Sequence, residues 1–136
     1  MSCLWADLVL EENPPARPDK AGWCRYQKDL MQDDLYYAYV VEAMGMIVGF
    51  ATGLIREDLE NEGDIYLEGG HMYVAPLYRK GKAGVLLHRM STEVCRKHGA
   101  KIFRRHVPVN NSRMMARLVR KGHIIRENTV DEMMRA

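Results

Sequence analysis

The chain has 136 residues, of which 47% are hydrophobic and 28% charged, with 5 prolines. This length and composition predict one compact domain spanning residues 1–136 with its own core, and they exclude a mainly disordered chain. No window approaches the roughly 20 apolar residues of a membrane span, and no basic segment precedes a long apolar run at the N-terminus, so we expect a soluble, cytoplasmic protein that makes no membrane contact.

Charge is divided unevenly along the chain. Residues 1–75 contain fourteen Asp or Glu and five Lys or Arg, whereas residues 76–126 contain fourteen Lys or Arg and one acid, Glu93. A basic half of this kind predicts contact with a polyanionic ligand, with a nucleic acid, or with the acidic half of a second copy in a homodimer. Nucleic acid is the least favoured, because residues 76–126 offer only Tyr78 and Phe103 for stacking bases.

Two short helices are predicted at the start of the chain. Residues 4–12 (LWADLVLEE) and 19–32 (DKAGWCRYQKDLMQ) have helical spacing of their apolar residues. Asn13 and three prolines separate them, and proline interrupts helices because it lacks the backbone N–H. We therefore expect two helices joined by an irregular connection.

A β-hairpin and a third strand are predicted next. Residues 35–55 are rich in β-branched and aromatic side chains, with Gly45 between two halves, which predicts a hairpin that turns at this glycine. After an acidic loop, residues 65–74 alternate as a strand does, but Gly69 and Gly70 shift the parity of the alternation. Such a shift is typical of a β-bulge.

The second half of the chain predicts a long helix followed by shorter elements. From Ala83 onward, Leu87, Met90 and Val94 recur at helical spacing, and Gly99 supplies a C-terminal stop. The later elements are a strand at 100–109, a helix at 110–121, and two short strands at 123–127 and 129–134. The fold class is therefore mixed α/β, with a right-handed crossover through the long helix.

The connection before the long helix combines positive charge with glycine. A helix that begins near Lys82 presents unpaired N–H groups and the positive end of its dipole, and Gly81 and Gly84 let a ligand approach closely. Arg79 and Lys80 add positive charge at the same place. The arrangement predicts a phosphate or pyrophosphate site, although neither GxxxxGK[ST] nor GxGxxG is present.

The same stretch, MYVAPLYRKGKAGVLL, resembles the acyl-CoA signature of the GCN5-related N-acetyltransferase (GNAT) superfamily. Val74, Pro76, Arg79 and Gly84 fall on positions of that signature, whereas Lys82 stands where its first glycine is usual. Two further stretches are similar to family segments: AMGMIVGF in the hairpin, and NNSRMMARLVRKGHIIRE near the C-terminus. Together they cover most of residues 35–127 in the family's order.

The resemblance implies a GNAT-like acyl-CoA N-acyltransferase fold of the α+β class, with a mixed, mostly antiparallel central sheet flanked by helices. It also implies that acetyl-CoA is the co-substrate and lies between two splayed strands, with no metal required. The residues implied to bind acetyl-CoA are Tyr73, Val74, Arg79, Lys80, Gly81, Lys82, Ala83, Gly84 and Asn111.

The implied reaction is direct attack of an amine of a small molecule or peptide on the thioester. An amine of pKa near 10.4 costs about 4–5 kcal/mol to deprotonate at pH 7, so a general base is useful. Glu68 is the first candidate and His71, on the same strand, is the second. The family's usual tyrosine proton donor aligns with Leu118, which cannot donate, so water or another tyrosine, Tyr73 or Tyr78, would have to serve, and Tyr73 is the candidate. The acidic first half favours a cationic amine, such as a polyamine, an aminoglycoside or a lysine-containing peptide.

Two alternatives stay open at this point. The departures at Lys82, Leu118 and His123 allow a protein of this fold that has lost turnover and acts in binding, structure or assembly, for example one encoded by a phage. His88, Cys95 and His98 on the long helix suggest a metal, but no second cluster completes a coordination shell, so we expect no metal site.

Overall fold

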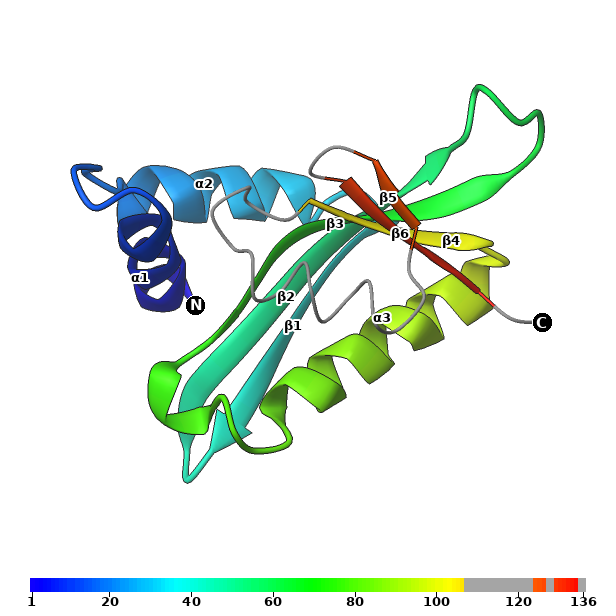
Figure 1. Ribbon diagram of the computed structural model, residues 1–136. Coiled ribbons are helices and arrows are strands. Elements are labelled where there is room, and N and C mark those ends of the chain that lie inside the picture. Colours follow the sequence, from blue (N-terminus) through cyan, green and yellow to red (C-terminus); the bar gives the residue numbers. More distant parts are fainter. Residues whose placement is uncertain (107–123, 127–128, 135–136) are drawn as a thin grey trace.

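The computed structural model describes residues 1–106, 124–126 and 129–134, and the structural statements below concern these residues (Figure 1). Two helices precede a six-stranded sheet, and a third helix connects its two halves. The elements are α1 (Ser2–Glu12), α2 (Lys20–Leu30), β1 (Tyr36–Ala43), β2 (Met46–Glu57), β3 (Ile65–Val74), the 3-10 turn η1 (Pro76–Tyr78), α3 (Ala83–His98), β4 (Ile102–His106), β5 (Ile124–Arg126) and β6 (Thr129–Met133).

The described strands lie in the order β1-β2-β3-β4-β6-β5, and among them only the β3–β4 pair is parallel. That pair is joined by the crossover through α3, as the sequence predicts. The hairpin is also confirmed, because Met44 and Gly45 both have positive φ, of 52° and 78°, and thus form the mirror-image type of turn that suits antiparallel strands. The two short strands near the C-terminus are confirmed as β5 and β6.

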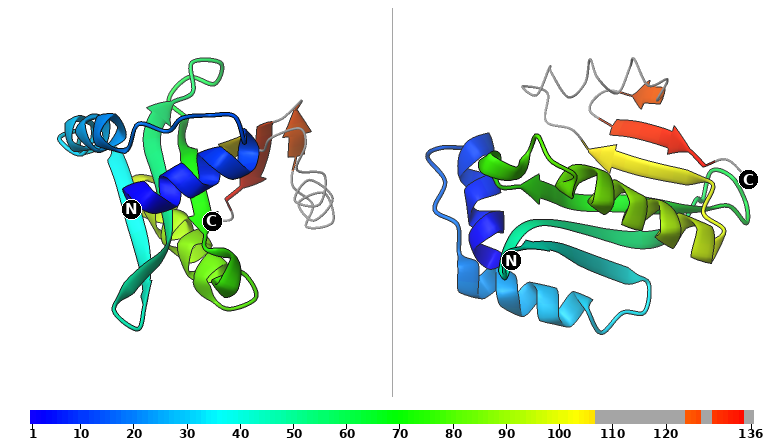
Figure 2. Two further views of the ribbon diagram at one scale, coloured as in Figure 1. Left: turned by 90° about the vertical axis from the view of Figure 1, so that its left-hand side faces the viewer. Right: turned by 90° about the horizontal axis from the view of Figure 1, so that it is seen from below.

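Helices cover both faces of the sheet (Figures 1 and 2). On one face, α3 packs Val94 and Cys95 against Leu67 and Phe103. On the other face, Leu8 of α1 and Trp23 of α2 pack against β2 and β3, and Trp5 stacks on Trp23 with ring centroids 5.2 Å apart. The two clusters share no residue, so β2 and β3 contribute side chains to both sides of the sheet.

The predicted bulge lies where β2 and β3 pair. Ala51 pairs with Met72 and Gly53 with Gly69, so Thr52 alone faces both Gly70 and His71. The Thr52 Oγ1 accepts a hydrogen bond of 2.9 Å from the backbone N–H of His71. The extra residue reverses the side-chain parity along β3. Leu67, before the bulge, packs toward α3, whereas Tyr73, after it, packs toward α1.

Helix α3 ends as its sequence predicts. Gly99 has a left-handed φ of 68°, and the N–H of Ala100 donates to the Cys95 carbonyl. The last turn holds Arg96, Lys97 and His98, whose positive charge suits the negative end of the helix dipole. Among the residues that the structure describes, no helix is long and apolar enough to cross a membrane.

The bulge generates a prediction about stability. A Cβ added at Gly70 would lie 2.4 Å from Thr52 Oγ1, so Gly70→Ala must displace the side chain that holds the bulge. We expect a loss of about 1–3 kcal/mol in the free energy of unfolding, measured by urea denaturation. Gly84→Ala is the matched control, because a Cβ there meets nothing within 4 Å. Equal stability of the two variants would contradict this account of the bulge.

Candidate active site

In the part of the chain that the structure describes, β3 and β4 run side by side only at their beginning. Tyr66, Leu67 and Glu68 pair with Ile102 to Arg104, and beyond this register β3 continues to Val74 with pairing to β2 alone (Figure 1). The strands diverge immediately before the bulge. Within the described residues, the β4-facing edge of β3 after Glu68 therefore has no neighbouring strand.

The backbone of Val74 faces that open edge. The N–H of Ala75 donates to the Val48 carbonyl at 2.8 Å, and Gly49 is paired with Val74. Residues of an antiparallel pair alternate between bonding to the partner strand and pointing away from it. Because Ala75 bonds to β2, the N–H and carbonyl of Val74 point away from β2, toward the side where β4 has separated.

The N-terminus of α3 lies just beyond Val74 in the chain. The first helical bond across the cap runs from the Leu86 N–H to the Lys82 carbonyl, at 2.9 Å. Within the described residues, the N–H groups of residues 82–85 have no hydrogen-bond partner, and no side chain caps the helix. A Cβ at Gly84 would meet nothing within 4 Å, so the space beside this turn is open. Lys80 and Lys82 are both exposed.

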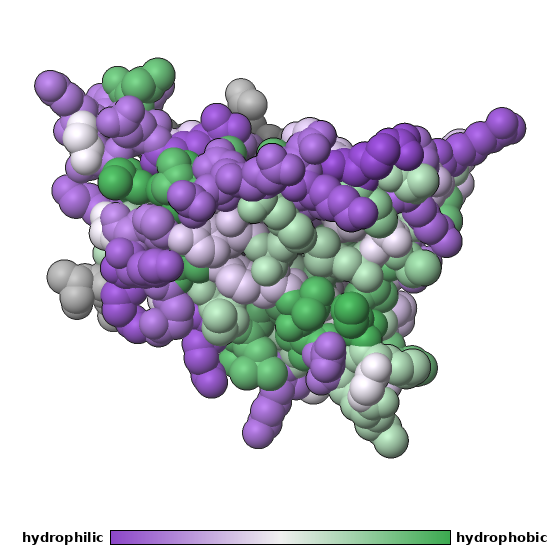
Figure 3. Space-filling view, turned by 180° about the vertical axis from the view of Figure 1, so that it is seen from behind, coloured by the Kyte–Doolittle hydropathy of each residue, from purple (hydrophilic) through white to green (hydrophobic). Residues whose placement is uncertain are grey.

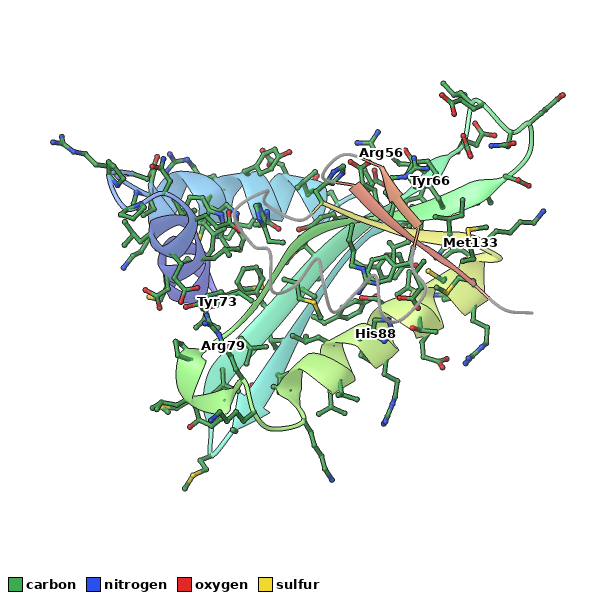
Figure 4. The ribbon with its side chains drawn as sticks, in the orientation of Figure 1. Arg56, Tyr66, Tyr73, Arg79, His88 and Met133 are labelled. Atoms are coloured by element: carbon green, nitrogen blue, oxygen red, sulfur yellow. The ribbon has the colours of Figure 1, made fainter. Side chains whose placement is uncertain are left out.

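Arg79 is anchored. Its Nε donates to the Val74 carbonyl at 2.8 Å, and its Nη2 binds both carboxylate oxygens of Glu11 at 2.8 and 2.9 Å. Its guanidinium also lies 5.2 Å from the centroid of the Tyr73 ring, and Figure 4 shows the two side chains together at the end of β3. Arg79 thus ties α1 to the end of β3, a contact that nothing in the spacing of Glu11 and Arg79 could have predicted.

Tyr73 is part of the core on the α1 face. Only 6% of the residue is exposed, and it packs with Leu8, Trp23 and Phe50. Burial, followed by the negative charge of Glu11, raises the pKa of the Tyr73 phenol, while Arg79 opposes the shift. The hydroxyl therefore stays protonated at neutral pH, which is the state that a proton donor needs.

A pocket of about 190 Å³ lies beside the bulge and contains both predicted bases. Its walls come from α2, β1, β2 and β3. They include Tyr26, Gln27, Tyr36, Thr52, Arg56, Glu68, Gly69, Gly70 and His71. Sequence reasoning placed Glu68 and His71 on one strand but missed the wall contributed by α2 and β1, because only the fold brings those elements to β3.

Two side chains contact the Glu68 carboxylate. One carboxylate oxygen forms an ion pair with Arg56 Nε, and the other lies 3.5 Å from His106 Nε2. About a third of the Glu68 side chain is exposed. The carboxylate is thus shared between the pocket and an ion-pair network, so accepting a proton there would weaken both contacts.

His71 reaches the same pocket and, in the described part of the chain, its imidazole has no hydrogen-bonded or ionic partner. The residue is exposed overall, yet protein atoms crowd the ring on the pocket side. This partial desolvation lowers the pKa of His71 below 6.5, and the charge of Glu12 partly offsets the shift. A neutral imidazole at pH 7 is able to accept a proton.

Several sequence predictions lie outside the described residues. They concern Asn111, Leu118 and His123, the remainder of the 100–109 strand beyond His106, and the helix at 110–121. The metal hypothesis falls on described residues, which hold no group of three or more possible metal ligands. His88 lies 2.9 Å from Glu132, His98 bonds to Tyr37, and Cys95 is buried (His88 is labelled in Figure 4).

Comparison with known proteins identifies the family and the fold. Residues 4–121 match the model of the acetyltransferase (GNAT) family, so the chain belongs to that family. It is an acetyltransferase of a family that uses acetyl-CoA. The mixed sheet with helices on both faces is the fold expected from the sequence. No curated protein matches the chain.

Solved structures share the fold at low sequence identity. A transcriptional regulator from Bacillus halodurans C-125 has a TM-score of 0.77 and 18% identity, covering 90% of this chain and 83% of its own. A ribosomal-protein-alanine N-acetyltransferase from Brucella melitensis has a TM-score of 0.70 and 16% identity, covering 97% and 91%. AAC(6')-Iy in complex with a bisubstrate analog, CoA-S-monomethyl-acetylneamine, has a TM-score of 0.69 and 19% identity, covering 93% and 85%.

The surroundings of His71 generate a prediction about its titration. We expect NMR of the imidazole to give a pKa below 6.5, because crowding disfavours the charged ring. Glu12→Gln should lower it further, since Glu12 favours the charged form. Asp29→Asn, on α2, is the control and should leave it unchanged. A pKa at or above 6.5 in the native protein would contradict the desolvation of this ring.

Proposed function

We propose that this chain is an N-acetyltransferase that transfers an acetyl group from acetyl-CoA to an amine of a small molecule or peptide. The amine attacks the thioester directly, without a covalent enzyme intermediate, and residues 1–136 form one cytoplasmic catalytic domain. The observation that carries the proposal is the outward-facing backbone of Val74 at the divergence of β3 and β4, beside the free N–H groups that begin α3.

The donor side fits acetyl-CoA. When bound, acetyl-CoA supplies the activated acetyl group and a pyrophosphate. The N–H of Val74 is suited to bind a thioester oxygen, because it points away from β2. The N–H groups of residues 82–85 and the exposed amines of Lys80 and Lys82 are suited to bind pyrophosphate. Gly81, Ala83 and Gly84 belong to the same turn.

Arg79 takes a positioning role in this proposal. Its contacts with Glu11 and the Val74 carbonyl fix the path of the chain between β3 and α3. The phosphate charge would then be met mainly by Lys80, Lys82 and the helix N-terminus. Asn111 keeps the role implied by the resemblance, beside the pantetheine arm.

The acceptor side is the pocket beside the bulge. An ammonium group must lose a proton before it attacks, at a cost of about 4–5 kcal/mol at pH 7 for an ordinary amine. His71 is the better-placed base, because its ring is neutral at that pH and has no competing described partner. Glu68 is the second candidate, and its negative charge also attracts a cationic amine into the pocket. Tyr73 is the proposed donor to the departing thiolate.

The acceptor is proposed to be a cationic amine. Glu68 lines the pocket, Glu12 acts on His71, and the loop from 57 to 64 carries further acids. The negative charge of these side chains raises the local concentration of cations near the pocket. Two of the similar structures are a ribosomal-protein-alanine N-acetyltransferase and AAC(6')-Iy in complex with a bisubstrate analog built on acetylneamine. A polyamine, an aminoglycoside or a lysine-containing peptide is the class we propose.

The proposal is tested by measuring release of free CoA from acetyl-CoA in the presence of a panel of these amines. We expect His71→Gln to lower kcat about 100-fold or more, as loss of a general base does, and to remove the acidic limb of its pH profile. Glu68→Gln should act mainly by raising KM for the amine. Glu62→Gln, in the outer loop, is the matched control for charge and should have no effect.

Two outcomes would contradict the assignments. Unchanged kcat in both His71→Gln and Glu68→Gln would remove both residues from proton transfer. Absence of turnover with every amine, in a protein that still binds acetyl-CoA, would favour a binding or assembly role instead of catalysis.

A further inference from the structure

Strand β1 is one edge of the sheet, and within the described residues no strand lies along its outer side (Figure 2). The N–H of Ile55 donates to the Leu35 carbonyl, which continues the register in which Tyr36 pairs with Leu54. By the alternation of antiparallel pairs, Ala38 and Val40 then direct their N–H and carbonyl groups outward. These backbone groups have no partner in the described part of the chain.

This edge lacks the usual protection against pairing. Natural edge strands carry proline, lysine or a bulge that prevents a second strand from adding. From Tyr36 to Val41 the strand has no charge and no proline, and its only acid, Glu42, lies beyond the register shift that follows Val41. Six consecutive residues therefore present a regular, uncharged edge.

An apolar surface continues from the edge onto α3. Figure 3 shows hydrophobic side chains gathered on this face of the molecule, over the β1–β2 hairpin and beside α3. The exposed apolar residues of the hairpin and of α3 include Met44, Met46, Ile47, Leu86 and Met90, whereas Val40 lies on the edge strand with its side chain on the α2 face of the sheet. A cavity of about 290 Å³ between β1 and α3 is lined by Tyr37, Tyr39, Met90, Glu93, Val94 and Lys97. Contiguous patches of this kind mark interaction sites.

We propose that β1 pairs antiparallel with β1 of a second copy of this chain, around a two-fold axis at Ala38. In this register each Ala38 faces the other, and Tyr36 faces Val40 of the second copy. The N–H of Tyr36 already donates to the Asp33 carbonyl, so its carbonyl alone is available. The pairing forms two bonds between the Ala38 residues and two from Val40 N–H groups to Tyr36 carbonyls, and the two sheets become one.

The positions of two charged residues on α3 are consistent with the same two-fold axis. Tyr37 contacts Lys97 and His98. Tyr39 packs against the core cluster that contains Val94 and Cys95. Ala38, between the two tyrosines, therefore lies beside Cys95 when positions are compared along the axis of α3. Glu93 and Lys97 are each two residues from Cys95, and Glu93 also forms an ion pair with Arg96 on its own helix. A two-fold axis at Ala38 therefore brings Glu93 of one copy to the level of Lys97 of the other, twice. A surface that is its own complement in both backbone and charge fits a second copy better than an unrelated partner.

Sedimentation velocity over a concentration series tests the interface. We expect the native chain to sediment with twice the mass of one chain at micromolar concentration, and Val40→Lys to raise the dissociation constant at least about tenfold, because the axis introduces the change twice. Leu59→Lys is the matched control, since Leu59 is 92% exposed in the β2–β3 loop. A native chain that remains monomeric up to about 100 μM, or equal effects of the two variants, would overturn the proposal.

Exchanging the charges of Glu93 and Lys97 tests the dimer a second time without altering the β1 side chains. Glu93→Lys alone and Lys97→Glu alone should each weaken the dimer, because like charges then face each other across the axis. The double variant should restore it. Failure of the double variant to recover dimerisation, with helical content unchanged by circular dichroism, would overturn the proposed axis. Neither Val40 nor these α3 residues belongs to the proposed catalytic site, so this test is independent of acetyl transfer.

Discussion

The hydrogen bond between the His71 N–H and Thr52 Oγ1 is the contact on which the rest of the site depends. It holds two residues of β3 opposite one residue of β2, and it is possible only because Gly70 leaves room for the threonine side chain. The reversal of parity that follows directs Tyr73 into the α1 face of the core and His71 toward the pocket. Without the extra residue, Leu67 and Tyr73 would lie on the same face.

The position of the bulge explains how one strand serves two purposes. Before it, β3 pairs with both β2 and β4 and is an ordinary central strand. After it, β3 pairs with β2 alone among the described strands, so the N–H of Val74 is left for a ligand while its carbonyl accepts from Arg79. The Arg79 contacts with Glu11 and with the Val74 carbonyl then fix the turn that leads to the N-terminus of α3. The proposed cofactor and acceptor sites thus lie on either side of one local irregularity.

Much of this arrangement could be predicted from the sequence, because it follows from local chemistry. Gly69 and Gly70 indicated the bulge, Gly45 the hairpin turn and Gly99 the end of α3, since each serves a backbone requirement that neighbouring residues reveal. The ion pairs could not be predicted. Glu11 meets Arg79 across 68 residues of chain, and Arg56 meets Glu68 across two strands, so the fold alone decides these contacts.

The two candidate bases illustrate the same limit. The family resemblance favoured Glu68 because it lies on β3 near the position where many family members carry a general base. The structure places Glu68 in an ion pair and leaves His71 neutral and unpaired among the described residues, which reverses the order of preference. The exposure, the bonding partners and the pKa of Glu68 and His71 depend on neighbouring residues from β2, α1 and β4. The spacing of residues along β3 contains no information about those neighbours.

The most direct test of the account is titration calorimetry of the native chain with acetyl-CoA. We predict binding with a Kd on the order of micromolar that weakens with added salt, and loss of about tenfold or more in Lys80→Ala/Lys82→Ala, because these amines and the α3 N-terminus would bind the pyrophosphate. Lys20→Ala/Lys28→Ala removes two exposed lysines from α2 and should bind as the native chain does. No heat of binding to the native chain, or equal affinity in both double variants, would contradict the donor site proposed between β3 and α3.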